Sequence, residues 1–183
     1  MKKVILFILV FSLSLTILAG CFSYRDMNHL LFYTMGVGDI KDDQFMFYGE
    51  GFKAFRGEGE KAGKEIRVVL FGKGKSLTEA VEQMRNTVNY PIEYAGNKSF
   101  VFSRALAENG ISNIIDIFSR DQKPSLRMYL LVYDGQAADL LRIKMKDEQF
   151  MGLYIYQLMN SQKNALGIIN NQYYQFIKNM QTG

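Results

Sequence analysis

The chain of 183 residues carries 22 Lys and Arg against 18 Asp and Glu, with one His, one Cys and no Trp. A single cysteine excludes disulfide frameworks and cysteine-based zinc or iron–sulfur sites. The charge excess is far below the basic surplus that is typical of nucleic-acid-binding domains, so we expect no nucleic-acid partner. With one histidine, a Ser-His-Asp or Cys-His enzyme would have to use His29.

Residues 1–20 have the features of a signal peptide. Lys2-Lys3 forms a short positive region, and an apolar run follows over Val4–Leu18. As a helix this run would be roughly 22 Å long, which is shorter than a hydrocarbon core of about 30 Å. These dimensions favour a cleaved signal peptide over a membrane span.

The segment Leu18-Ala19-Gly20-Cys21 matches the bacterial lipobox, in which an aliphatic residue and two small residues precede a cysteine. The Cys21 thiolate would take a diacylglyceryl group, and the small side chains would let the signal peptidase reach the Gly20–Cys21 bond. We expect Cys21 to become the lipidated first residue of the mature chain, with or without an added N-acyl chain, and to hold it on the extracytoplasmic side of a membrane. The alternative is a buried cysteine in an uncleaved membrane anchor.

The first half of the mature chain predicts strands and one helix. Apolar, aromatic-rich runs predict a strand pair at Leu30–Val37 and Gln44–Tyr48, separated by the polar segment 38–43. Five glycines and six charges in Gly49–Gly63 predict a mobile surface loop. A strand is expected at Glu65–Phe71, followed by a capping box at Ser76–Glu79 and an amphipathic helix to Val88.

The second half predicts two strands and several helices. The strands are Lys98–Phe102 and Leu126–Tyr133, the second ended by the turn pair Asp134-Gly135. The helices are expected at 104–109, 111–118, 136–143, 147–160 and 165–180. We therefore predict a single extracytoplasmic domain at residues 21–183, of α+β class, with a mixed β-sheet, packed helices and a helix-rich C-terminal third.

Three local patterns allow a chemical and a structural interpretation. Gly74-Lys75-Ser76 resembles half of a phosphate-binding loop, but Val69 stands where that loop needs glycine, which favours a turn and a helix cap. The segment 49–54 formally fits a dinucleotide fingerprint, yet no hydrophobic helix follows it. Asp42-Asp43 and the cluster Asp116, Arg120 and Asp121 could hold a cation or form ion pairs, but exposed charges are usually solvated. We expect no catalytic, cofactor-binding or metal-binding residues.

Four stretches, in order behind the lipobox, resemble the N-terminal domain of the spore germination receptor C-subunit lipoproteins, the Ger(x)C family. They are Gly20–Asn28, Met35–Asp39, Gly74–Ala80 and, most specifically, Lys98–Leu141. Two positions depart from the family pattern: Phe22 stands for the usual Trp, and Met27 for an aliphatic residue. The family resemblance covers its N-terminal domain only, so we expect this chain to be truncated relative to the family.

The resemblance implies a non-enzymatic lipoprotein subunit of a nutrient germinant receptor in the spore inner membrane. Its implied partners are the membrane, through the lipid on Cys21, and the integral A and B subunits of the receptor. Only Cys21 carries a functional role over from the family. A free-standing surface lipoprotein that binds a small solute for uptake is the second interpretation, and a two-lobed binding protein of that kind usually needs a longer chain.

Overall fold

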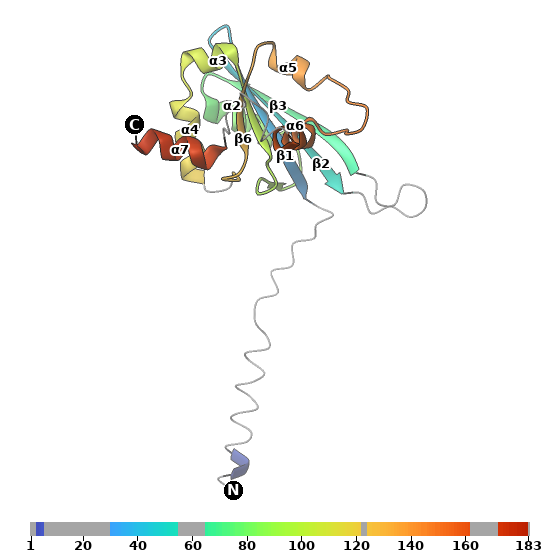
Figure 1. Cartoon of the computed structure of the whole chain (residues 1–183). Helices are drawn as coiled ribbons and strands as arrows, with labels where there is room; N and C mark the ends of the chain where they lie inside the picture. The colour runs from blue at the N-terminus through green and yellow to red at the C-terminus, as the bar shows by residue number, and fades with distance from the viewer. Residues whose placement is uncertain (1–2, 6–29, 55–64, 122–123, 162–171, 183) are drawn as a thin grey trace.

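The computed structural model describes residues 3–5, 30–54, 65–121, 124–161 and 172–182. They form a six-stranded mixed sheet with helices on both faces (Figure 1). The strands lie in the order β3-β2-β1-β5-β6, and β4 pairs with β1. This arrangement confirms the α+β class with a mixed sheet.

Strands β1 (Leu31–Lys41) and β2 (Gln44–Ala54) form an antiparallel hairpin. Their two-residue turn is Asp42-Asp43, where φ is 51° and 56°, and such left-handed pairs suit the twist of a hairpin. The strand pair is confirmed, but both strands are longer than expected, and most of the polar segment 38–43 continues β1.

The loop predicted at Gly49–Gly63 is wrong over its first six residues, which belong to β2. They pair with β1 on one side and with β3 (Glu65–Gly74) on the other, from Gly49↔Leu70 to Ala54↔Glu65. Backbone pairing on both sides outweighs the low strand propensity of glycine. Residues 55–64 lie outside the described part of the chain.

Helix α2 (Leu77–Arg85) begins at a capping serine, as the sequence indicated. The Ser76 hydroxyl accepts a hydrogen bond from the Glu79 N–H at 3.2 Å, and the Glu79 carboxylate accepts one from the Lys75 N–H at 2.8 Å. A β-carbon at Gly72 would collide with the backbone of Ala80, so a glycine is needed there for α2 to lie close to β3. Gly74 is thus the last residue of β3, and Lys75-Ser76 forms the bend and the helix cap.

Three segments continue the sheet in parallel with β1. They are β4 (Ile92–Glu93), β5 (Ser99–Ser103) and β6 (Tyr129–Tyr133). β6 is shorter than predicted, since Leu126 lies outside it. Leu130 is buried on one face of β6 and Leu131 is half-buried on the other. Val132 is 60% exposed, because β6 is the last strand of the sheet.

The helices cover the two faces unequally. Helices α2, α3 (Arg104–Asn109), α4 (Ser112–Asp121) and α7 (Tyr173–Thr182) supply buried residues to the larger core cluster on one face. Helices α5 (Ala137–Leu140) and α6 (Met151–Ser161) supply the smaller cluster on the other face. The last three helices are shorter than predicted within the described residues, and 162–171 lie outside them.

One irregularity in β1 lets a single strand serve both cores. The pairing register with β2 shifts between Tyr33 and Met35, which is a β-bulge centred on Thr34. Leu31 and Tyr33 therefore pack in the larger cluster, whereas Met35 and Val37 pack in the smaller one.

Candidate functional site

The residues that the sequence singled out do not assemble into one site. Cys21 and His29 lie outside the described residues. Asp42 and Asp43 form the exposed hairpin turn, and Asp116 pairs with Arg120 at 2.8 Å on the surface of α4. The side chain of Asp121 is outside the described part. Within the described ranges, no group of three His, Cys, Asp or Glu side chains could hold a metal ion.

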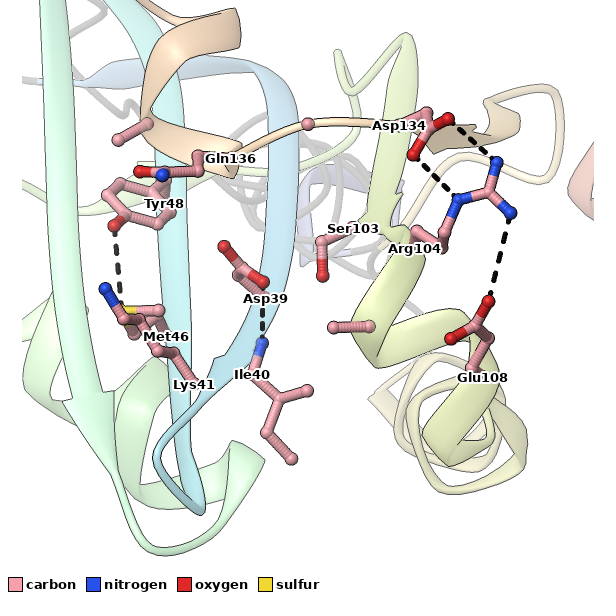
Figure 2. Close-up of a pocket in the computed structure, with 13 residues that line it drawn as sticks. Asp39, Ile40, Lys41, Met46, Tyr48, Ser103, Arg104, Glu108, Asp134 and Gln136 are labelled. Atoms are coloured by element: carbon pink, nitrogen blue, oxygen red, sulfur yellow. Dashed lines mark hydrogen bonds and ion pairs between the residues drawn. The ribbon is translucent and has the colours of Figure 1, made fainter.

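The candidate site is a cavity of about 510 Å³ at the carboxyl ends of the parallel strands β1, β5 and β6 (Figure 2). Ligands in α/β proteins often bind at this edge of a sheet, and the volume is in the range of small-molecule sites. Its charged lining residues are Asp39, Lys41, Arg104, Glu108 and Asp134, and its large apolar or aromatic lining residues are Ile40, Met46 and Tyr48.

An ion pair between two strand ends forms one wall of the cavity. Arg104 is the first residue of α3, directly after β5, and Asp134 directly follows β6. The Arg104 Nε and Nη2 donate to the two Asp134 carboxylate oxygens at 2.7 and 2.9 Å, and Glu108 lies 3.8 Å from the same guanidinium. The hydrogen bond and charge of Arg104 lower the pKa of Asp134, and those of Asp134 raise the pKa of Arg104.

The opposite wall is built around Asp39, near the end of β1 (Figure 2). One carboxylate oxygen accepts from the Ile40 N–H at 2.8 Å, and the other from the Ala137 N–H of α5 at 3.3 Å. Burial, and then the charge of Asp39, raise the pKa of the Tyr48 hydroxyl. Two backbone amides thus hold the Asp39 carboxylate beside a neutral tyrosine.

These groups are suited to binding a small polar ligand. Cations and carboxylates face one cavity with an apolar surface between them, so a ligand with both charges could be held without covalent chemistry. The Ser103 hydroxyl is buried and accepts from the Leu106 N–H at 3.1 Å, which makes it a helix cap.

The sequence did not reveal this site, because its residues come from three separate stretches of the chain, 39–48, 103–108 and 134–138. Arg104 and Asp134 meet since β5 and β6 are parallel neighbours that end at the same level, Ser103 opposite Tyr133. The available signal was their position in the chain: Asp134 directly follows the predicted strand 126–133, and Arg104 comes two residues after the predicted strand 98–102.

A second polar group, Glu50, lies in β2 and is completely buried. Its carboxylate accepts from Arg67 Nε at 2.7 Å, from the Thr34 hydroxyl at 3.0 Å, and from the backbone N–H groups of Met151 and Gly152 at 3.0 and 2.8 Å. Met151 and Gly152 are the first residues of α6, where free N–H groups and the helix dipole favour a negative charge. This network joins α6 to the sheet and has a structural role.

In the parts of the chain that are described, no helix has both the length and the apolar character needed to cross a bilayer.

Comparisons with known proteins agree on one family. The family model described as "Spore germination protein N-terminal domain" matches residues 23–183. The chain is also similar to the protein of Bacillus subtilis (strain 168) named "Putative spore germination protein YfkR", with 25% identity over 164 residues, which is 86% of this chain and 43% of that protein. The chain thus spans less than half the length of this relative. No solved structure matches. Because the family model covers residues 23–183, most of the chain, the chain belongs to the spore germination protein N-terminal domain family.

Proposed function

We propose that this protein is a lipid-anchored, non-catalytic subunit of a nutrient germinant receptor in the spore inner membrane. The family match over residues 23–183 carries the proposal, because it begins two residues after Cys21. The two findings are independent: the lipobox is a short processing motif, and the match covers the folded part.

The lipobox supports attachment through Cys21 alone. Two acyl chains on one cysteine suffice for stable anchoring, since each buried CH₂ contributes about 0.8 kcal/mol. The described fold begins at Leu30, nine residues after Cys21, so the folded domain would stay close to the bilayer and to integral subunits within it.

The surface of α6 supports a role in an assembly. None of its eleven residues is charged, and Tyr154 and Leu158, one helical turn apart, are exposed. A surface helix of a monomeric protein usually presents charged residues on its outer face. An uncharged outer face is more typical of a helix that contacts a partner.

The test is purification of the tagged full chain from detergent-solubilised spore membranes. We expect the integral A and B subunits to be recovered with it. Substitution Cys21→Ser should release the chain from the membrane fraction and abolish this recovery while leaving the domain folded. Recovery of a lipidated chain without integral subunits would contradict the receptor role, and retention of Cys21→Ser after high-salt washing would contradict the lipid anchor.

The cavity favours one other function, that of a surface lipoprotein that binds a small solute. Its volume of about 510 Å³ and its groups of both charges suit a small ligand. In that case the chain would be purified alone, and a zwitterionic solute would raise the melting temperature of the wild type but not that of Arg104→Gln. Glu79→Gln, outside the cavity, is the matched control.

A further inference from the structure

The end of the sheet opposite the cavity carries exposed lysine, arginine, tyrosine and isoleucine side chains. Here β1 begins and β2 ends, at the lower edge in Figure 1. A cross-strand row at this edge runs from Ile66 of β3 through Lys53 and Leu31 to Ile92 of β4. β5 and β6 start on the same side of the sheet but further in: the Lys98 N–H donates to the Thr34 carbonyl, and the Tyr129 N–H donates to the Lys98 carbonyl. Lys98 and Arg127 therefore lie near this edge, beside the row. We call the exposed and half-exposed residues here the basal surface: Lys53, Ile66, Tyr90, Lys98 and Arg127.

Lysines on the basal surface lie against tyrosine rings. The Lys53 Nζ lies 3.8 Å from the centroid of the Tyr90 ring, and the Lys98 Nζ lies 5.2 Å from that of Tyr156. Tyr90 is 37% exposed and Ile66 is 50% exposed. Tyrosine rings with long basic side chains beside them are typical of the membrane–water interface, where the ring lies among headgroups and the ammonium reaches phosphate.

The charges differ between the two ends of the sheet. The basal surface has three cations. Among the described side chains, the carboxylates on this side include Glu93, which accepts from the Ala95 N–H at 3.1 Å, and Glu148, which accepts from the N–H of Phe150, whose ring lies 5.3 Å from that of Phe52. The opposite end, around the hairpin turn and the cavity, carries six carboxylates and four cations among the described residues: Asp39, Asp42, Asp43, Glu79, Glu108 and Asp134, with Lys41, Lys73, Lys75 and Arg104. An anionic bilayer would therefore favour contact with the basal surface over contact with the other end.

Chain length places the basal surface nearest to the anchor. Leu30 is nine positions after Cys21, and a fully extended chain of that length spans at most about 30 Å. β1 then carries the chain eleven residues away, which is roughly 36 Å at 3.3 Å per residue. With a lipid on Cys21, the basal surface lies within reach of the headgroups, and the cavity faces away from them.

We propose that the basal surface binds anionic phospholipid headgroups, through Lys53, Lys98 and Arg127, with Tyr90 and Ile66 at the interface. This inference rests on the lipid anchor of the proposed function. It gives the domain one orientation on the membrane, with the cavity open to the extracytoplasmic space.

The absence of tryptophan from the chain allows a direct test. Tyr90→Trp places a reporter on the basal surface. Phe71→Trp places one on an exposed aromatic position of β3, five residues beyond Ile66, which is roughly 16 Å along the strand. The lipidated full chain is reconstituted in phosphatidylglycerol or phosphatidylcholine vesicles that contain brominated lipid. We expect strong quenching at position 90 in phosphatidylglycerol, little in phosphatidylcholine, and little at position 71 in either.

Charge variants test the role of the lysines. In the Tyr90→Trp background, Lys53→Gln with Lys98→Gln should remove the difference between the two lipids. Lys73→Gln with Lys75→Gln, which removes the same charge near the other end, should preserve it. Circular dichroism checks that each variant is folded.

Two failures can be told apart. A chain absent from the vesicle fraction would contradict the lipid anchor, and the inference with it. A vesicle-bound chain with equal quenching at positions 90 and 71, or with none at 90, would overturn the inference alone and indicate that the basal surface faces protein or solvent.

Discussion

At the scale of single residues, Glu50 is the most consequential side chain of the fold. A buried carboxylate is costly unless its oxygens are hydrogen-bonded and its charge is paired. Glu50 has both, from Arg67, Thr34 and two amides of α6. Arg67 also donates to the Leu141 carbonyl at 2.8 Å, so the network joins β1, β2 and β3 to the chain on both sides of the α5–α6 connection.

We expect Glu50→Gln to lower the free energy of unfolding by about 3 kcal/mol, because it leaves the Arg67 charge unpaired and turns an amide NH₂ toward other donors. The measurement is urea denaturation followed by circular dichroism. Glu79→Gln, the same change on the exposed start of α2, is the control and should cost less than about 1 kcal/mol. Equal midpoints for the two variants would show that the network contributes little.

The Arg104–Asp134 pair should give a measurable pH effect. In the folded protein the pKa of Asp134 lies below its ordinary value. The pair therefore stabilises the folded state at pH values above the ordinary pKa of aspartate. This stabilisation is lost as the pH falls through the lowered pKa. Titration of the Asp134 carboxyl carbon by NMR should show the low pKa in the wild type and a higher one in Arg104→Gln. An unchanged titration in this variant would assign the shift to another cause. Since both side chains are largely exposed, the effect on stability should be small.

At the scale of elements, α6 depends on a close approach to β1. An ideal β-carbon on Gly152 would lie 2.6 Å from the Thr34 carbonyl oxygen. Thr34 is the bulged residue of β1, and its hydroxyl binds Glu50. The bulge, the buried carboxylate and the glycine therefore act together where α6 begins.

We predict that Gly152→Ala destabilises the protein, although alanine is the better helix former by up to about 1 kcal/mol. The added methyl group must push the start of α6 away from β1 and lengthen both bonds to Glu50. Hydrogen exchange should show weaker protection of α6 amides. Gln157→Ala, an exposed position on the same helix, should leave exchange almost unchanged; a stabilised Gly152→Ala variant would refute the close contact.

At the scale of the whole molecule, the core is centred on Phe100 of β5. Its ring contacts those of Phe47, Phe102 and Phe118, with centroids 5.6, 4.8 and 4.9 Å away. These rings come from two strands on either side of β1 and from α4. The segment 98–141, which resembles the family most specifically, contains three of these four rings; the fourth, Phe47, comes from β2.

The loss of stability caused by truncating a side chain to alanine should therefore follow a definite order. Phe100→Ala should cost about 3–5 kcal/mol, Phe118→Ala somewhat less because it is half-buried, and Leu131→Ala less again because it lies at the smaller core. Val132→Ala, exposed in the same strand as Leu131, is the control and should barely move the urea midpoint. A Val132→Ala midpoint as low as that of Phe100→Ala would place the core elsewhere.

The sequence alone determined most elements of this protein, because each depends on near neighbours in the chain. The capping serine at 76, the helices expected at 104–109 and 111–118 and the α+β class all follow from local patterns, and the structure confirms them. The family was also readable from short motifs in order. The lipid on Cys21 stays a prediction.

Tertiary structure decided what depends on residues far apart. Gly49–Ala54 is a strand because β1 and β3 pair with it on both sides, and no local pattern contains that partnership. The bulge at Thr34 turns one strand toward two cores. The cavity exists because β5 and β6 end side by side and bring Arg104 to Asp134. Backbone pairing and burial are cooperative over the whole sheet, and for that reason they override the preference of glycine-rich, charged segments for loops.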